Sequence, residues 1–141
     1  MKNVLIATAC SIVFLSMTYE GTWHDKRIAD EEEYELPTDS TLIQDMGFQG
    51  FAVEHVIVIQ PKKKPRGGEL TEDEKAHNRE INRIRVQIEH VIGSVKRCRI
   101  VKDRCRLWRE GVRDMVMETC CGLHNLRITY RPWSYELCNE S

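Results

Sequence analysis

The sequence predicts a mixed α/β protein, because short β-branched runs occupy its first half and amphipathic helical patterns its second half. Val, Ile and Phe are concentrated in residues 4–8 and 12–16, which we interpret as two buried strands. Shorter runs of the same kind at 41–45 and 56–59 predict two further strands. A lysine-, proline- and glycine-rich stretch at 60–70 has little to bury and predicts an exposed basic loop.

Three helices complete the expected set of elements. A short one at 26–33 should turn Ile28 and Ala29 inward and an acidic face outward. The second begins with a capping box, in which Thr71 and the glutamate three residues later satisfy free backbone N–H groups, and it continues to about residue 97. Its apolar residues at 3–4 spacing predict one buried stripe formed by Ile81, Ile84, Ile88, Val91, Ile92 and Val95.

The third helix is expected over residues 109–127, with an inner face formed by Met115, Val116, Cys120, Leu123 and Leu126. Trp108 and Trp133, at either end of it, are interpreted as packing residues rather than as platforms for stacked bases. The adjacent cysteines Cys120 and Cys121 are expected to be buried free thiols, which indicates a reduced, intracellular setting. The six cysteines form no C-x-x-C pair, so the sequence offers no zinc finger.

Length and composition allow one soluble domain. The chain has 141 residues, of which 41% are hydrophobic and 30% charged, so it can build its own core and is not typical of disorder. The net charge of −1 hides an acidic segment at 30–35 and basic segments at 62–66 and 96–109. Because a partner responds to the local patch, this total does not exclude DNA binding.

The first fifteen residues permit a second interpretation, that of a secretion signal. Lys2 precedes an apolar run to Leu15, and residues 7–10 (ATAC) resemble a lipoprotein cleavage site. The run is interrupted by polar residues and is too short to span a bilayer. A small secreted lipoprotein would leave the remaining sequence unexplained, so strands are the preferred interpretation.

Two carboxylates occupy positions suited to chemistry. Asp45 ends a short apolar strand and precedes Met-Gly-Phe, where a glycine lets backbone or ligand come close; the alternative is an ordinary turn aspartate. Glu89 lies in the middle of the long helix, and Arg85 and Lys96 share its face at 3.6-residue periodicity. The alternative there is a simple i,i+4 ion pair, worth about 0.3–0.5 kcal/mol.

These residues resemble the signature of bacterial insertion-sequence transposases of the DDE superfamily. Arg85, Glu89 and Lys96 match the end of the pattern Y-x2-R-x3-E-x6-K, and residues 45–48 (DMGF) match the D-x-G-[YF] block. The flanking segments TYEGTWHDKRIADE, LIQDMGFQGF, PKKKPRGGELTEDEK and VMETCCGLHNLR are similar to the same family over nearly the whole chain.

The resemblance implies a ribonuclease-H-like mixed sheet with flanking helices, and two Mg²⁺ or Mn²⁺ ions held between three acids for attack on a DNA phosphodiester. Asp45 would be the second aspartate and Glu89 the third acid, both catalytic and metal-binding. Arg85 and Lys96 would orient the glutamate or contact DNA phosphate. DNA at transposon ends is the implied partner, in the bacterial cytoplasm and at the nucleoid when bound, with a further copy or a full-length transposase as a possible protein partner.

His24 and Asp25 match a G-x-x-H-D step of the family, and we expect them to support the metal site rather than ligate it. A helix N-cap formed by Asp25 is the alternative. Lys62, Lys63 and Lys64 would contact DNA phosphates, or else form a solvated loop or a localisation signal. DNA contact is also favoured for the basic residues after the long helix, namely Arg97, Arg99, Lys102, Arg104 and Arg106.

Two departures from the family pattern bear on activity. The tyrosine expected three residues before Arg85 is Asn82. The first aspartate, which the family carries in a D-G-T/S strand, is expected upstream of residue 1, so the domain lacks its first strand. We therefore expect either an inactive remnant or one part of a split gene. The competing hypothesis is a non-catalytic DNA- or protein-binding remnant.

Overall fold

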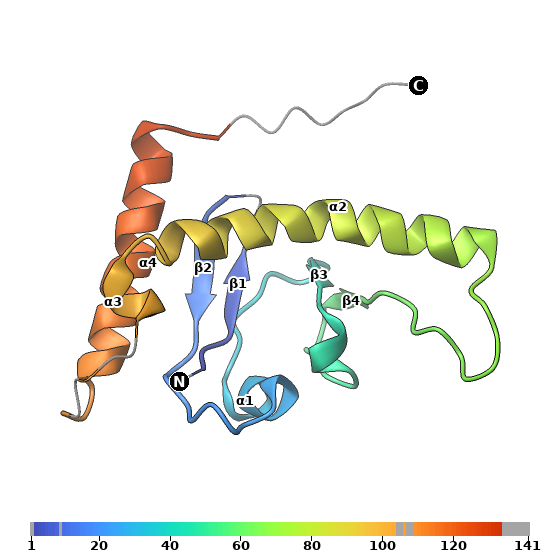
Figure 1. The fold of residues 1–141 in the computed structure, drawn as a ribbon, viewed down its shortest axis with the longest axis horizontal. Helices are drawn as coiled ribbons and strands as arrows, with labels where there is room; N and C mark the ends of the chain where they lie inside the picture. Colours follow the sequence, from blue (N-terminus) through green and yellow to red (C-terminus); the bar gives the residue numbers. More distant parts are fainter. Residues whose placement is uncertain (1, 9, 104–105, 107–108, 134–141) are drawn as a thin grey trace. The chain divides into compact units, whose positions relative to one another are not determined.

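The computed structural model describes residues 2–8, 10–103, 106 and 109–133 of the chain (Figure 1). Its elements are β1 (Leu5–Ala7), β2 (Ile12–Leu15), α1 (Asp25–Glu31), β3 (Thr41–Ile43), the 3-10 turn η1 (Met46–Phe48), β4 (Ile57–Ile59), α2 (Glu72–Val95), α3 (Arg99–Lys102) and α4 (Val112–Tyr130). The predicted mixed α/β class is confirmed. The strands form two separate two-stranded sheets in the described part of the chain, β1–β2 and β3–β4.

The chain divides into two compact units. The first contains residues 1–4 and 16–86, and the second contains residues 5–15 and 87–141. Helix α2 therefore contributes its first fifteen residues, Glu72–Val86, to the first unit and its remaining residues to the second.

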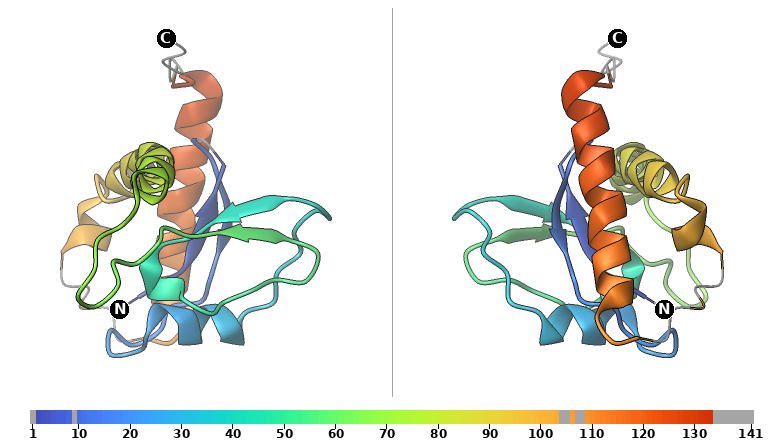
Figure 2. Two further views of the ribbon diagram at one scale, coloured as in Figure 1. Left: turned by 90° about the vertical axis from the view of Figure 1, so that its right-hand side faces the viewer. Right: turned by 90° about the vertical axis from the view of Figure 1, so that its left-hand side faces the viewer.

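The first unit contains the parallel pair β3–β4 (Figure 2). In its register, Thr41, Leu42 and Ile43 lie opposite Ile57, Val58 and Ile59. Both strands are shorter than predicted but lie where the β-branched runs placed them. Helix α1 buries Ile28 and Ala29 almost completely, as its pattern predicted. The isolated bridge between Lys2 and Tyr19 brings the beginning of the chain to the segment that precedes α1.

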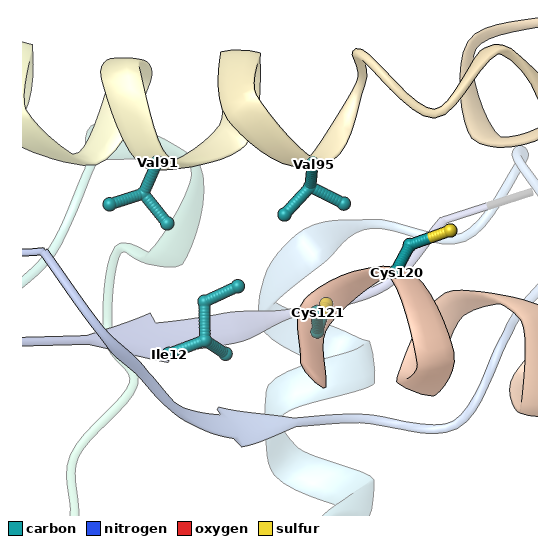
Figure 3. Close-up of a cluster of buried hydrophobic side chains, with 5 residues drawn as sticks. All are labelled: Ile12, Val91, Val95, Cys120 and Cys121. Carbon is teal, nitrogen blue, oxygen red and sulfur yellow. The ribbon is translucent and has the colours of Figure 1, made fainter. Parts of the chain in front are cut away.

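The second unit contains the antiparallel pair β1–β2, whose register shifts between Ile6 and Ala7. Its core is formed by Ile12 from β2, Val91 and Val95 from α2, and Cys120 and Cys121 from α4 (Figure 3). The two cysteines are free thiols, as predicted, while Cys105 and Cys138 lie outside the described residues. Burial raises the pKa of Cys120 to about 11 with a contribution from Cys98, so this thiol stays protonated.

Three predictions about burial were wrong. β1 is half-buried rather than buried, and in β2 only Ile12 is buried, while Phe14 and Leu15 are half-buried and Val13 is exposed, because each strand belongs to a sheet of only two strands. Ile84 on α2 is 41% exposed, whereas Ile81 is buried. On α4 the buried residues are Cys120, Cys121, His124 and Ile128, whereas Met115, Leu123 and Leu126 are exposed. Both faces of α4 carry apolar residues, so periodicity alone did not select the inner one.

The face of α4 is selected by polar contacts with β2 that periodicity does not describe. Asn125 Oδ1 accepts from the Ile12 N–H at 2.9 Å, and Asn125 Nδ2 donates to the Ile12 carbonyl at 2.8 Å. One residue earlier, His124 Nε2 lies 2.7 Å from the Cys10 carbonyl. The Asn125 amide thus pairs with the edge of β2 as a neighbouring strand would. With α4 in this orientation, Cys120 and Cys121 face the core of the second unit. Trp133 packs against the same core, as expected, while Trp108 lies outside the described residues.

The N-terminus of α2 is set by the predicted capping box. Thr71 Oγ1 accepts from the Glu74 N–H at 3.2 Å, and Glu74 Oε2 accepts from the Thr71 N–H at 3.0 Å. The bond from Thr71 and the nearby Lys62 ammonium lower the pKa of Glu74 below its ordinary value of 4.5. The ionised carboxylate is therefore the form that stabilises this helix end.

Replacing Asn125 by alanine should destabilise the protein by about 1–3 kcal/mol, because the Ile12 N–H and carbonyl both lose their partner. Urea unfolding followed by circular dichroism measures this loss. Leu126→Ala is the matched control, since Leu126 is the next residue on α4 and is 53% exposed. Equal stability of the two variants would contradict the role given to the amide.

Stability should also depend on the charge of Glu74. Because the folded state lowers the pKa of this group, its contribution is complete well above pH 4.5 and disappears as the pH falls through the lowered value. Glu74→Gln keeps an acceptor for the capping box but removes the titration. Unfolding curves from pH 7 to pH 3 should show the wild type losing its advantage over this variant in acid. A gap that stays constant over that range would refute the assignment.

Candidate active site

The strand before Asp45 ends at Ile43, two residues earlier than predicted, and Asp45 lies at the start of the turn η1 as its N-cap. Its Oδ1 accepts from the Met46 N–H at 2.6 Å, so the carboxylate caps the turn. The side chain keeps 51% of its surface exposed. The turn-aspartate interpretation is thus correct as a local description, and it leaves the second oxygen open to another partner.

That partner is Arg85 of α2. Arg85 Nη2 donates to Asp45 Oδ2 at 3.1 Å, and the pair joins residues 40 positions apart in the sequence. The first unit therefore brings the D-x-G-F block and the arginine of the R-x3-E block into direct contact. Sequence reasoning placed Arg85 beside Glu89 or at DNA and did not foresee its bond to Asp45, because periodicity reports only on residues of the same helix.

Gln44, which is only 6% exposed, binds the segment after Asp45 through its side-chain amide. Its Nε2 donates to the Phe48 carbonyl at 3.2 Å and to the Phe51 carbonyl at 3.3 Å. Its backbone N–H donates to Ile59 of β4 at 3.0 Å, so the end of β3 is fixed as well. Sequence analysis missed Gln44, because a polar residue at the end of a strand gives no signal that it is buried.

Asp25 lies against the D-x-G-F turn, but it is not the N-cap of α1 as the alternative proposed. It is the first residue of the helix, and His24 occupies the cap position without a side-chain bond. Asp25 Oδ1 pairs with Lys2 Nζ at 3.4 Å. A Cβ atom built on Gly47 would lie 3.1 Å from Asp25 Oδ2, so the glycine permits the close approach of α1 and η1.

Glu89 and Lys96 belong to the second unit. Glu89 is exposed on α2, and Lys96 is exposed directly after the last residue of that helix, with its N–H bonded to the Ile92 carbonyl at 2.9 Å. Asn82, which replaces the tyrosine of the family pattern, is exposed on α2 in the first unit. The structure therefore keeps each of these side chains accessible without assigning it a role.

The carboxylates of the described residues do not by themselves fit a metal pair. In the ranges 2–8, 10–103, 106 and 109–133, no three His, Cys, Asp or Glu side chains gather in a way that could hold a metal ion. Asp45 moreover gives one oxygen to Met46 and the other to Arg85. A metal at Asp45 would therefore compete with the guanidinium.

The basic loop is anchored at Lys62 by Asn78 of α2. The Lys62 N–H donates to Asn78 Oδ1 at 2.8 Å, and Asn78 Nδ2 donates to the Lys62 carbonyl at 3.0 Å. The Lys62 ammonium lies 3.5 Å from Glu74 Oε1. Lys63 and Lys64 follow this anchor and are exposed, as predicted.

The predicted basic cluster after α2 is exposed wherever the structure describes it, at Arg97, Arg99, Lys102 and Arg106, while Arg104 lies outside the described residues. A separate finding concerns membranes: within the described ranges, none of the helices combines the length and hydropathy needed for a bilayer crossing.

The Asp45–Arg85 pair should contribute little to folding. Its side chains are 51% and 36% exposed, and exposed ion pairs contribute about 0–1 kcal/mol. Arg85→Gln should therefore change the free energy of unfolding by less than about 1 kcal/mol. Gln44→Ala, by contrast, should cost about 1–3 kcal/mol, because the buried amide is lost from the Phe51 carbonyl and the Phe48 carbonyl loses one of its donors. Chemical denaturation compares the two variants, and a larger loss for Arg85→Gln would contradict the description of this pair as accessible.

Comparison with known proteins gives the family of the chain. The sequence profile of the DDE superfamily endonucleases matches residues 3–125. The chain is 31% identical over 114 residues to the protein assigned as transposase of insertion sequence element IS702 of Microchaete diplosiphon, a match that covers 79% of the chain and 40% of the relative. It is 27% identical over 128 residues to the transposase assigned to insertion sequence element IS112 of Streptomyces albus G, covering 89% and 47%.

The chain thus spans less than half the length of these curated relatives. No solved structure matches it. The profile match extends over most of the chain and includes Asp45, Arg85 and Glu89. The chain therefore belongs to the DDE superfamily of endonucleases, as a transposase domain.

Proposed function

We propose that this domain takes part in DNA strand cleavage and transfer during transposition, with Asp45 and Glu89 as catalytic carboxylates that bind Mg²⁺ or Mn²⁺. The supporting observation is the contact between Asp45 Oδ2 and Arg85 Nη2, which joins the two motif blocks of the signature within one unit. An exposed pair of this kind adds little stability, so folding alone gives little reason for it. The carboxylate oxygens are hard ligands, which suit these cations.

The ribonuclease-H-like architecture is part of the proposal. It is supported by the combination of an antiparallel pair, β1–β2, and a parallel pair, β3–β4, in one chain. A mixed sheet needs both kinds of pairing. We propose that His24 and Asp25 help to position Asp45. The observation in favour is that Asp25 lies against Gly47, which belongs to the turn that Asp45 caps.

DNA is the proposed partner, within the bacterial cytoplasm. Lys63 and Lys64 are exposed beside the anchored Lys62, and Arg85 lies at Asp45 with 36% of its side chain exposed. Cations arranged in this way gain from the release of counterions when they neutralise phosphates, so binding should weaken as salt increases. Lys96 is assigned to the same role in the second unit.

We also propose that the 141-residue chain does not cleave DNA by itself. Two of the three acids of the family pattern are present at Asp45 and Glu89, and the described residues offer no group of three donors. A third acid would have to be supplied to this domain before the metal pair could be held.

Metal binding and cleavage by the purified chain test these proposals separately. Titration with Mn²⁺, followed by electron paramagnetic resonance of the free ion, should detect weak binding that Asp45→Asn and Glu89→Gln each reduce by at least about tenfold. Glu54→Gln is the matched control, because Glu54 is a carboxylate with 88% of its side chain exposed and lies outside both motif blocks. Binding that is equal in all three variants would overturn the metal role of Asp45 and Glu89.

The second measurement is nicking of a labelled DNA duplex with Mg²⁺ or Mn²⁺. The chain alone is expected to leave the duplex intact. Cleavage that Asp45→Asn abolishes would refute the proposed inactivity and would establish the chain as an enzyme. DNA binding with neither metal binding nor cleavage would favour the non-catalytic interpretation.

A further inference from the structure

A small open recess adjoins the turn that Asp45 caps. It is lined by Met46, Gln49, Gln60, Pro61 and Lys63 and is open to solvent. Met46 and Gln49 come from η1 and its C-terminal cap, and the other three residues come from the segment after β4. All five belong to the first unit, as does Asp45.

The walls of the recess combine three kinds of chemistry. Met46, which is 44% exposed, and the Pro61 ring offer apolar surface. Gln49 is exposed, and Gln60 Nε2 donates to the Phe48 carbonyl at 3.4 Å, which leaves its own carbonyl as an acceptor. Lys63 supplies a positive charge. An apolar surface, amides and a cation together suit a nucleotide, because its base has a flat face that packs on apolar surface and an edge that pairs with amides, and its phosphate is anionic.

The anchor at Lys62 explains why Lys63 is the lysine at this recess. Asn78 binds both backbone groups of Lys62, and the Lys62 ammonium faces Glu74. The backbone of the next residue is therefore held close to a fixed position, and its ammonium is not used by the ion pair with Glu74. Lys64 is equally exposed, but it does not line the recess.

We propose that this recess binds one nucleotide of the DNA strand beside Asp45. Lys63 contacts a backbone phosphate, Gln49 contacts the base edge, and Met46 packs against the sugar or the base. This inference rests on the proposed action on DNA and adds a site that the acidic motif does not contain. The three residues share no secondary-structure element, and only the fold brings Lys63 to Met46 and Gln49.

Protection of methionines from oxidation tests the position of the nucleotide. Hydrogen peroxide converts exposed methionines to sulfoxides, and peptide mass spectrometry measures the rate at each site. A bound DNA duplex or single strand should slow oxidation of Met46. Met17 is the matched control, because it lies in the same unit and is 59% exposed. If DNA binds without changing the oxidation rate of Met46, the recess is not a nucleotide site, while the proposed action on DNA is unaffected.

Paired lysine variants test the phosphate contact. In fluorescence anisotropy with a labelled oligonucleotide, Lys63→Gln should weaken binding by roughly threefold to tenfold near 0.1 M salt and lower the salt slope by about one. Lys75→Gln is the matched control, because Lys75 lies in the same unit, has 42% of its side chain exposed and belongs to neither the recess nor the basic loop; it should stay within about twofold of the wild type. Equal losses for the two variants would indicate that only net charge matters and would overturn the assignment of Lys63.

Two further measurements distinguish binding of a nucleotide at the recess from binding of negative charge alone, and from a failure of the proposed action on DNA. Heparin provides polyanionic charge without bases. If heparin protects Met46 as strongly as DNA does, the assignment of the recess to a nucleotide is overturned. Gln49→Leu should reduce differences in affinity among oligonucleotides of different base composition while it retains most of the binding. Absence of any DNA binding by the wild-type chain would overturn both the proposed function and the recess.

Discussion

In each unit, a side-chain amide of a helix binds both backbone groups of one extended residue. Two-stranded sheets and short extended segments leave backbone N–H and carbonyl groups without a strand partner, so side chains can supply these bonds. In the second unit, Asn125 of α4 binds both groups of Ile12, and in the first unit Asn78 of α2 does the same for Lys62. Each amide joins a helix to an extended segment at one residue. The core of Ile12, Val91, Val95, Cys120 and Cys121 can then close against β2 (Figure 3).

The same principle shapes the candidate site. Gln44 donates to two carbonyls of the segment that follows Asp45, and Asp45 itself accepts from the Met46 N–H. Backbone groups of this segment are thereby bound by neighbouring side chains. The second carboxylate oxygen of Asp45 accepts from Arg85. A side chain with this geometry is held in place while half of its surface stays open to solvent. Asp45 is therefore a fixed but accessible side chain rather than part of the core.

The sequence predicted the elements better than it predicted their faces. The capping box of Thr71 and Glu74 set the start of α2, and the inward residues of α1 followed from a short periodic pattern, because both are determined by neighbours in the chain. The inner face of α4 was right for Cys120 and Val116 but wrong for Met115, Leu123 and Leu126, which are exposed. All five are apolar, so only contacts with β2 distinguish them. The alternative that Asp25 caps α1 was wrong, since His24 occupies the cap position and Asp25 is the first residue of the helix.

The sequence by itself determined the mixed α/β class, the family signature at Asp45, Arg85 and Glu89, and the basic loop, because each depends on residue type and local spacing. Only the tertiary structure decided that Arg85 pairs with Asp45, that Gln44 supports the turn from a buried position, and that Lys63 meets Met46 and Gln49 at one recess. Those contacts join segments far apart along the chain, and which of many compatible partners meets a polar side chain is set by how strands and helices pack.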